Sequence, residues 1–284
     1  MSTPRSSGPG KDEPFDPHKV PISPAATVLL VRDDESGLDV FMLRRTLSAA
    51  FASGMYVFPG GRVDDADSHE ELGEICDGLT DEHASSLLQI PRNGLSFWVA
   101  AIRECFEEAG VLLARHAETG EVVRFDTPEV IERFEEARHL VHEGELSLTE
   151  LCRRENLRLT TDAIHYVSHW ITPAGERRRF DTRFFVARAP QAQEPLHDDG
   201  ETIESLWVKP REALSRFASG DLQMLPPTIS SLEFLLDCTT ADDALDAARK
   251  VGVPPVIEPR LRLNSDGKVI AVVMPGESGY DELG

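Results

Sequence analysis

The sequence predicts a mixed α/β fold, because short apolar runs of strand length alternate with longer segments of helical period. Residues 25–31 and 38–43 are β-prone runs on either side of turn residues, which predicts a hairpin. Residues 95–109 repeat apolar side chains at the helical period. The chain has 284 residues and can bury a substantial core.

Each further element is predicted from its local pattern. Residues 56–58 form a short strand before a glycine turn, and helical pieces follow at 68–77 and 80–89. Asn93 or Ser96 can cap the helix at 95–109. The later elements are helices at 127–143, 148–155, 210–218, 226–236 and 241–250, strands at 166–171, 182–188 and 204–208, and a hairpin of 261–263 with 269–273.

The order of these elements predicts one main domain. Residues 1–24 are rich in proline, serine and glycine, which predicts a disordered N-terminal tail. We expect the domain to span residues 25–240 and to carry a helical lid at 127–160. A C-terminal helix and hairpin, residues 241–284, are expected to pack on it.

Charge and cysteine usage limit the classes of partner. Lys plus Arg total 29 and Asp plus Glu total 50, a net charge of −21, which argues against nucleic acid and anionic membranes. No apolar run reaches membrane-spanning length, and neither a signal pattern nor a peroxisomal address is evident. The four cysteines show no CxxC pair, so we expect a reducing, cytoplasmic setting.

The most informative segment is residues 103–111, which read Arg-Glu-Cys-Phe-Glu-Glu-Ala-Gly-Val. On a helix, Glu104, Glu107 and Glu108 lie on one face, where their like charges repel. A hard divalent cation such as Mg²⁺ or Mn²⁺ would relieve that repulsion through oxygen ligands. The alternative is a solvated acidic face, but the opposite side of this helix is apolar, which favours a metal site.

This segment resembles the second half of the Nudix box, whose pattern is G, five residues, E, seven residues, then R-E-U-x-E-E-x-G-U. The resemblance implies an α/β/α sandwich that cleaves a nucleoside diphosphate linked to another group. It also implies metal ligation by Glu104, Glu107 and Glu108, and orientation of a glutamate by Arg103. Gly60 and Gly61 would let the backbone approach the metal and substrate.

The first half of the box departs from the family pattern. Gly61 fits the opening glycine, but Asp67 stands where the family has glutamate, and an insert at residues 68–95 interrupts the box. The carboxylate that replaces the glutamate stays open at this point, and the candidates are Asp67, Glu70, Glu71, Glu74 and Asp77. A split box is typical of the peroxisomal-type coenzyme A diphosphatases, and residues 170–173 and 179–185 also resemble that branch.

The branch resemblance implies hydrolysis of coenzyme A or acyl-coenzyme A to 3′,5′-ADP and (acyl-)phosphopantetheine. Arg44 and Arg45 are candidates to bind this substrate, although Ala50 stands where the pattern expects another arginine. The cluster at 177–179 is either a 3′-phosphate site or a solvated strand end. The general base is expected to be Glu104 or a loop glutamate, with Glu201 and Glu204 as the loop candidates. We expect Phe184 and Phe185 to be core residues rather than an adenine platform.

Two other functions compete with coenzyme A hydrolysis. One is a diphosphatase for ADP-ribose or for a dinucleotide such as NADH. The other, from a different class, is a non-catalytic Nudix-fold nucleotide-binding regulator. Such regulators usually lose the metal glutamates, whereas Glu104, Glu107 and Glu108 are all present here. A homodimer is one possible assembly of the enzyme.

Overall fold

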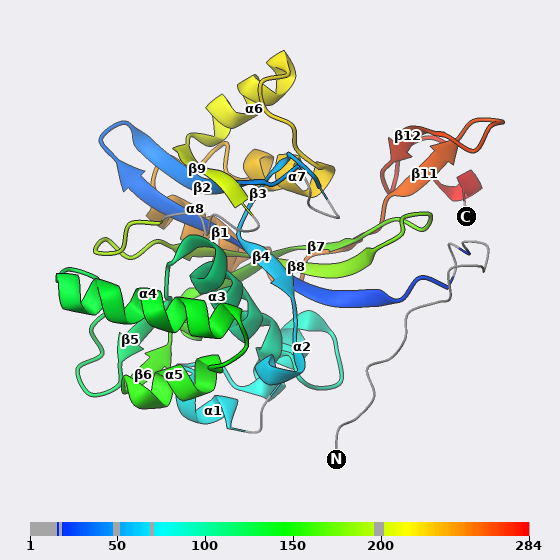
Figure 1. Ribbon diagram of the computed structural model, residues 1–284. Helices are drawn as coiled ribbons and strands as arrows, with labels where there is room; N and C mark the ends of the chain where they lie inside the picture. Colours follow the sequence, from blue (N-terminus) through cyan, green and yellow to red (C-terminus); the bar gives the residue numbers. More distant parts are fainter. Residues whose placement is uncertain (1–15, 17–18, 48–51, 69–70, 196–201, 284) are drawn as a thin grey trace.

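The computed structural model describes residues 16, 19–47, 52–68, 71–195 and 202–283, and these form three layers (Figure 1). A mixed β-sheet lies in the middle, and helices cover both of its faces. The predicted α/β sandwich is therefore confirmed. The division into a tail, a domain of residues 25–240 and a C-terminal part stays a prediction, and most of the tail lies outside the described residues.

Within the described residues the central sheet has eight strands. Its order is β10-β7-β8-β1-β2-β3, with β4 paired to β1 and β9 paired to β2. The central pair, β1 and β8, runs parallel from Ile22↔Arg179 to Val31↔Arg188, so β1 begins earlier than the sequence predicts. The strands are β1 (Ile22–Asp34), β2 (Gly37–Arg45), β3 (Tyr56–Val57), β4 (Gly60–Arg62), β7 (His165–Ile171), β8 (Arg179–Arg188), β9 (Thr202–Val208) and β10 (Val256–Ile257).

The two helical layers differ in content (Figure 1). One face of the sheet carries α1 (Leu72–Ile75), α2 (Asp81–Leu88), α3 (Leu95–Ala109), α4 (Pro128–His142) and α5 (Leu148–Arg154), with a small sheet of β5 (Ala114–His116) and β6 (Leu157–Leu159). The other face carries α6 (Pro210–Ser219), α7 (Pro226–Phe234) and α8 (Ala241–Val251). Short 3₁₀ turns are η1 (Asp65–Asp67), η2 (Thr161–Ala163) and η3 (Asp281–Leu283).

Alternation along the strands builds one apolar core on each side of the sheet. On β1, Val28 belongs to the core under α3, and Leu29 belongs to the core under α6, α7 and α8. Phe185 packs on Trp98 of α3 with ring centroids 4.7 Å apart, while Phe184 belongs to the opposite core. Both phenylalanines are buried, which confirms their predicted place in the core.

The insert contributes the cap of the central helix, α3. Asp81 of α2 accepts hydrogen bonds from the backbone N–H groups of Leu95 and Asn93, each at 3.0 Å. The sequence predicts a side-chain cap from Asn93 or Ser96, and this prediction is wrong, since neither side chain caps the helix. The Ser96 hydroxyl donates instead to the Asn93 carbonyl at 2.6 Å. At its other end α3 stops at Gly110, which adopts a left-handed conformation. The insert thereby fixes where the helix begins.

The C-terminal hairpin lies apart from the helical layers. It consists of β11 (Arg260–Leu263) and β12 (Val269–Val273) and stands to one side of the central sheet (Figure 1). It contacts the rest of the fold at the turn after β7, where a side chain at Gly175 would lie 3.1 Å from the Leu261 Cδ1 atom, and through Met274, directly after β12, which packs against the core under α6, α7 and α8. By contrast, α8 packs against β7 and β8.

Candidate active site

The candidate site is organised around the guanidinium group of Arg103 on α3. This side chain is buried, and its Nε and Nη2 atoms donate to Oδ1 and Oδ2 of Asp67, both at 2.9 Å. Nη2 also donates to the backbone carbonyl of Arg62 at 2.7 Å, which ties α3 to β4. Bidentate pairing of this kind fixes a guanidinium in both position and orientation.

Asp67 is therefore the carboxylate that pairs with the arginine of the motif. It is 1% exposed, and it closes the η1 turn by accepting the backbone N–H of Asp64 at 2.8 Å. The other described candidates are engaged elsewhere: Glu71 and Glu74 pair with Arg153, and Asp77 pairs with Arg158 and Arg115. Glu70 lies outside the described residues.

Two of the predicted metal ligands share the remaining nitrogen of Arg103. Its Nη1 atom donates to Glu104 Oε1 at 2.9 Å and to Glu107 Oε1 at 3.1 Å. Burial raises the pKa of Glu104, Glu107 and Asp67, and the charge of Arg103 only partly opposes this effect. When ionised, these three carboxylates exceed the single guanidinium in charge, so the site has a local surplus of negative charge.

Glu108 faces the glycine strand β4 and not the arginine. Its Oε2 atom accepts the backbone N–H of Gly60 at 2.9 Å, and Arg45 Nη1 lies 3.7 Å from Oε1. A β-carbon at Gly61 would overlap the carboxylate of Glu104, and one at Gly60 would overlap the backbone of Ala26. Only glycine therefore allows β4 to lie this close to both α3 and β1.

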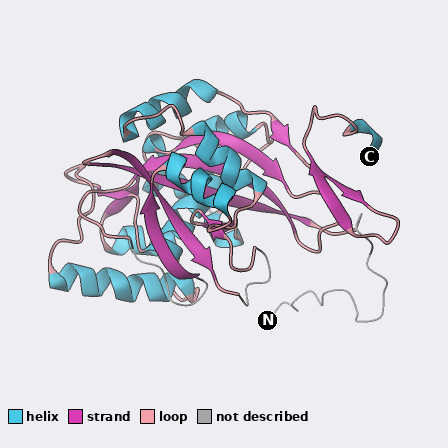
Figure 2. Ribbon diagram, turned by 90° about the horizontal axis from the view of Figure 1, so that it is seen from above, coloured by secondary structure: helices cyan, strands magenta, loops and turns pink. Residues whose placement is uncertain are grey.

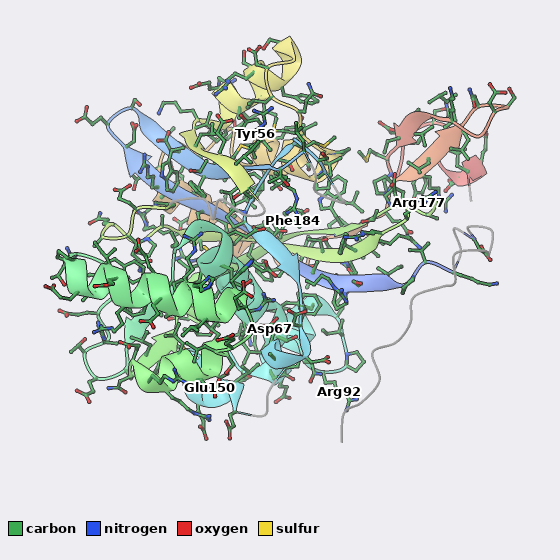
Figure 3. All side chains as sticks on the ribbon, viewed as in Figure 1. Tyr56, Asp67, Arg92, Glu150, Arg177 and Phe184 are labelled. Carbon is green, nitrogen blue, oxygen red and sulfur yellow. The ribbon has the colours of Figure 1, made fainter. Side chains whose placement is uncertain are left out.

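Several residues that the sequence analysis names as candidates for the site lie away from these glutamates. Arg44 and Glu204 meet on the face of the sheet opposite α3, where Glu204 Oε2 accepts the Tyr56 hydroxyl at 2.9 Å and lies 3.4 Å from Arg44 Nη1. Arg177 lies at the far end of the β7–β8 pair, well separated from Asp67 in Figure 3. Glu201, the other loop candidate for the base, lies outside the described residues.

Helix α4 contributes two residues that sequence reasoning misses. Arg138 Nε donates to the backbone carbonyl of Glu107 at 2.8 Å, and His142 Nδ1 lies 4.0 Å from Glu107 Oε2. The pattern of residues 127–143 predicts a helix, but no spacing in the sequence relates that helix to α3. These contacts anchor the last turn of α3, where Glu107 and Glu108 lie.

The glutamates do not converge on one point in this arrangement. Across the described ranges, no three His, Cys, Asp or Glu side chains are grouped as a metal-ligand set. The reason is visible in the hydrogen bonds, since Arg103 holds Glu104 and Glu107 while Gly60 holds Glu108. The chemistry of the donors nevertheless suits a hard divalent cation, because all are carboxylate oxygens beside a surplus of negative charge.

Comparison with known proteins assigns the chain to a family. Residues 75–235 match the model of the NUDT19 Nudix domain. The chain is 27% identical to the human protein named acyl-coenzyme A diphosphatase NUDT19, over 87% of this chain and 73% of that protein. It is 28% identical to the chicken protein of the same name, over 72% of this chain and 63% of the relative.

A solved structure shares the same architecture. The crystal structure of a Nudix hydrolase from Alicyclobacillus acidocaldarius superposes with a TM-score of 0.68 at 25% identity, covering 84% of this chain and 100% of that one. The predicted resemblance is thus confirmed by both sequence and structure. The chain belongs to the Nudix hydrolases, in the family described as the NUDT19 Nudix domain, and is a Nudix diphosphatase.

Proposed function

We propose that this protein hydrolyses the diphosphate bond of coenzyme A or acyl-coenzyme A in a reaction that depends on Mg²⁺ or Mn²⁺. The products are 3′,5′-ADP and phosphopantetheine or its acyl form. The observation that carries the proposal is the pairing of Arg103 with Asp67, beside three glutamates on one helix. It reproduces the charge arrangement of a Nudix box even though an insert splits the motif.

Glu104, Glu107 and Glu108 are the residues that would hold the cation. A bound divalent cation neutralises diphosphate oxygens and lowers the pKa of a water molecule. Since Glu104 and Glu107 contact Arg103 Nη1 through their Oε1 atoms, these side chains would either offer their Oε2 atoms to the cation or turn away from the arginine. Arg103 then keeps its two hydrogen bonds to Asp67, so it acts as a positioning residue for α3 and β4.

The chain offers two sources for the general base. Glu104 is the more direct one, because it is buried against β4 with a raised pKa that favours proton uptake near neutral pH. Glu201 stays a prediction from the sequence. Glu204 is not part of this proposal, since it lies on the other face of the sheet in contact with Tyr56 and Arg44.

The substrate class comes from the relatives and from the cations near the site. Both the human and the chicken relative are named acyl-coenzyme A diphosphatases. Arg45 beside Glu108 is a candidate to contact substrate phosphates together with the backbone of Gly60 and Gly61. Arg44 would need to act from the opposite face, so its predicted role in substrate binding has less support than that of Arg45.

We propose that the protein acts in the cytoplasm. Its partner would be a small-molecule substrate, and neither nucleic acid nor a membrane. The four cysteines are free, and three of them are buried, which suits a reducing compartment. No helix in the described part of the chain is long and apolar enough to cross a membrane. A homodimer is the assembly we propose.

Product analysis tests the proposed function. The protein is incubated separately with coenzyme A, ADP-ribose and NADH in the presence of Mg²⁺ or Mn²⁺, and the products are separated by liquid chromatography. We expect 3′,5′-ADP and phosphopantetheine from coenzyme A and little change in the other two. Hydrolysis of ADP-ribose or NADH with coenzyme A intact would assign the enzyme to the alternative substrate class. If none of the three compounds is hydrolysed, the result would favour the non-catalytic, nucleotide-binding regulator.

A further inference from the structure

The C-terminal hairpin presents a surface that the active site does not use. Strands β11 and β12 pair antiparallel, from Arg260↔Val273 to Leu263↔Val269, as a separate two-stranded sheet. Figures 1 and 2 both show this sheet standing clear of the helical layers. A two-stranded hairpin alone is at best marginally stable in water. This hairpin would therefore gain from a further strand or another surface.

Exposed apolar side chains are concentrated in this part of the chain. Strand β12 reads Val-Ile-Ala-Val-Val, without charge or proline, and Val269, Ile270 and Val272 are 51%, 61% and 43% exposed. Six of the eleven exposed large hydrophobic residues in the described chain come from this C-terminal stretch: Val253, Val256, Leu263, Val269, Ile270 and Val272. Scattered apolar residues are ordinary on a surface, but four of these six, Leu263, Val269, Ile270 and Val272, lie on one hairpin.

The two strands of the hairpin differ in what lies beside them. The end of the chain lies against β11, where Arg260 Nη1 donates to the Tyr280 carbonyl at 2.8 Å and the Tyr280 hydroxyl donates to the Glu258 carbonyl at 2.7 Å. Strand β12 pairs only with β11 in the described part of the chain, so its other edge is open. Sheet edges are usually protected by charge, proline or a covering element, and β12 has neither charge nor proline.

We propose that β12 pairs antiparallel with β12 of a second copy of this chain, about a two-fold axis at Ala271. Two hairpins would then form one four-stranded sheet with a self-complementary interface. This register uses all five residues of β12 and places Ile270 opposite Val272 of the partner subunit. Since it involves neither the glutamates nor the substrate, the inference is independent of the proposed function.

Charge supports a second copy as the occupant. In this register Lys268 lies opposite Met274 of the partner subunit, whose backbone N–H is hydrogen-bonded to the Glu277 carboxylate at 2.8 Å. Each Lys268 would therefore approach a glutamate of the other copy. Residues 260–273 carry three basic groups and one acidic group, 3 − 1 = +2, on a chain of −21. The hairpin is thus a part of the molecule where two acidic copies can meet with little repulsion.

Sedimentation of the full-length chain tests this pairing. At concentrations from low micromolar to several hundred micromolar, we expect the mass to rise from that of one 31.4 kDa chain toward twice that value. Ile270→Lys should weaken association at least about tenfold, because it places a lysine from each copy in the apolar interface. Ile131→Lys is the matched control, since Ile131 is an exposed isoleucine on α4, and it should associate as the wild type does.

A cysteine variant tests the register directly. Opposite residues of antiparallel strands have Cα atoms about 4.5–5.5 Å apart, within the range that a disulfide spans. Ala271→Cys should therefore form a covalent dimer under mild oxidation, whereas Asp266→Cys, in the hairpin turn, should not. The wild-type chain reports any contribution of its own cysteines. A chain that stays monomeric would overturn the proposal in favour of a different protein on the hairpin. A dimer that withstands Ile270→Lys and lacks the 271 cross-link would overturn it as well.

Discussion

Replacing Asp67 with asparagine removes the charge that neutralises Arg103 in the centre of the site. Asp67 is 1% exposed and accepts two hydrogen bonds of 2.9 Å from the guanidinium. Breaking a buried ion pair on one side costs about 3–5 kcal/mol. Glu104 and Glu107 still contact Arg103 Nη1, so we expect a smaller loss of ~2–3 kcal/mol in the free energy of unfolding.

Thermal unfolding and steady-state kinetics measure the two consequences of this change. A loss of that size lowers the melting temperature by roughly 5–10 °C in a domain of this size. We expect kcat to fall about 10–100-fold, as is usual when a group that orients metal ligands is removed. Asp77→Asn is the matched control, because Asp77 also pairs with an arginine but lies in the insert, and its kcat should stay near the wild-type value. If Asp67→Asn keeps the wild-type kcat, Asp67 does not orient the glutamates through Arg103. If only Asp77→Asn has a lower kcat, the carboxylate that supports the site lies in the insert.

Two further predictions concern the site, and a third concerns the cap of α3. Gly61→Ala should lower kcat because the new methyl group displaces the Glu104 carboxylate, whereas Gly73→Ala, with open space around it, should not; steady-state kinetics compares the two. Burial raises the pKa of Glu104 and Glu107, so the contribution of these two groups to the stability of the metal-free fold is greatest below the pKa of a free glutamate and is lost as pH rises through the raised values. Since cations bind the ionised forms, the increase in melting temperature caused by Mg²⁺ should grow between about pH 5 and about pH 8, and a constant increase would contradict this. Asp81→Ala should lower the free energy of unfolding by about 1 kcal/mol through loss of the α3 cap, measured by urea denaturation, with kcat little changed.

Local patterns predict the elements that have strong boundaries. The helix at Leu95–Ala109 is predicted to the residue, because its apolar stripe is regular and Gly110 stops it. Strand β4 is missed, since Gly60 and Gly61 are read as a turn, and only the neighbouring strand β1 makes this segment a strand. The cap of α3 is missed for a related reason, because it comes from Asp81 in another helix. Tertiary partners decide such cases, and the local sequence does not contain them.

The same limit applies to the site. Residues 103–111 predict the glutamates on one helix, because their spacing is local. The choice of Asp67 over the carboxylates of the insert depends on how the chain returns to Arg103, which residue types alone do not show. Arg44 and Arg45 are adjacent in sequence, but strand alternation sends them to opposite faces, and only Arg45 approaches Glu108.

Binding of Mn²⁺ to the wild type and to Glu107→Gln is the most direct test of the central claim, that the glutamates of α3 form a metal site. The substitution removes one carboxylate charge at nearly constant volume, and calorimetry gives the affinity and the number of ions bound. We predict that Glu107→Gln binds Mn²⁺ at least about tenfold more weakly, a change of ~1.4 kcal/mol, and that kcat with coenzyme A falls in parallel. Glu204→Gln, on the opposite face of the sheet, should bind Mn²⁺ as the wild type does. Equal affinity and equal kcat in Glu107→Gln and the wild type would contradict the claim.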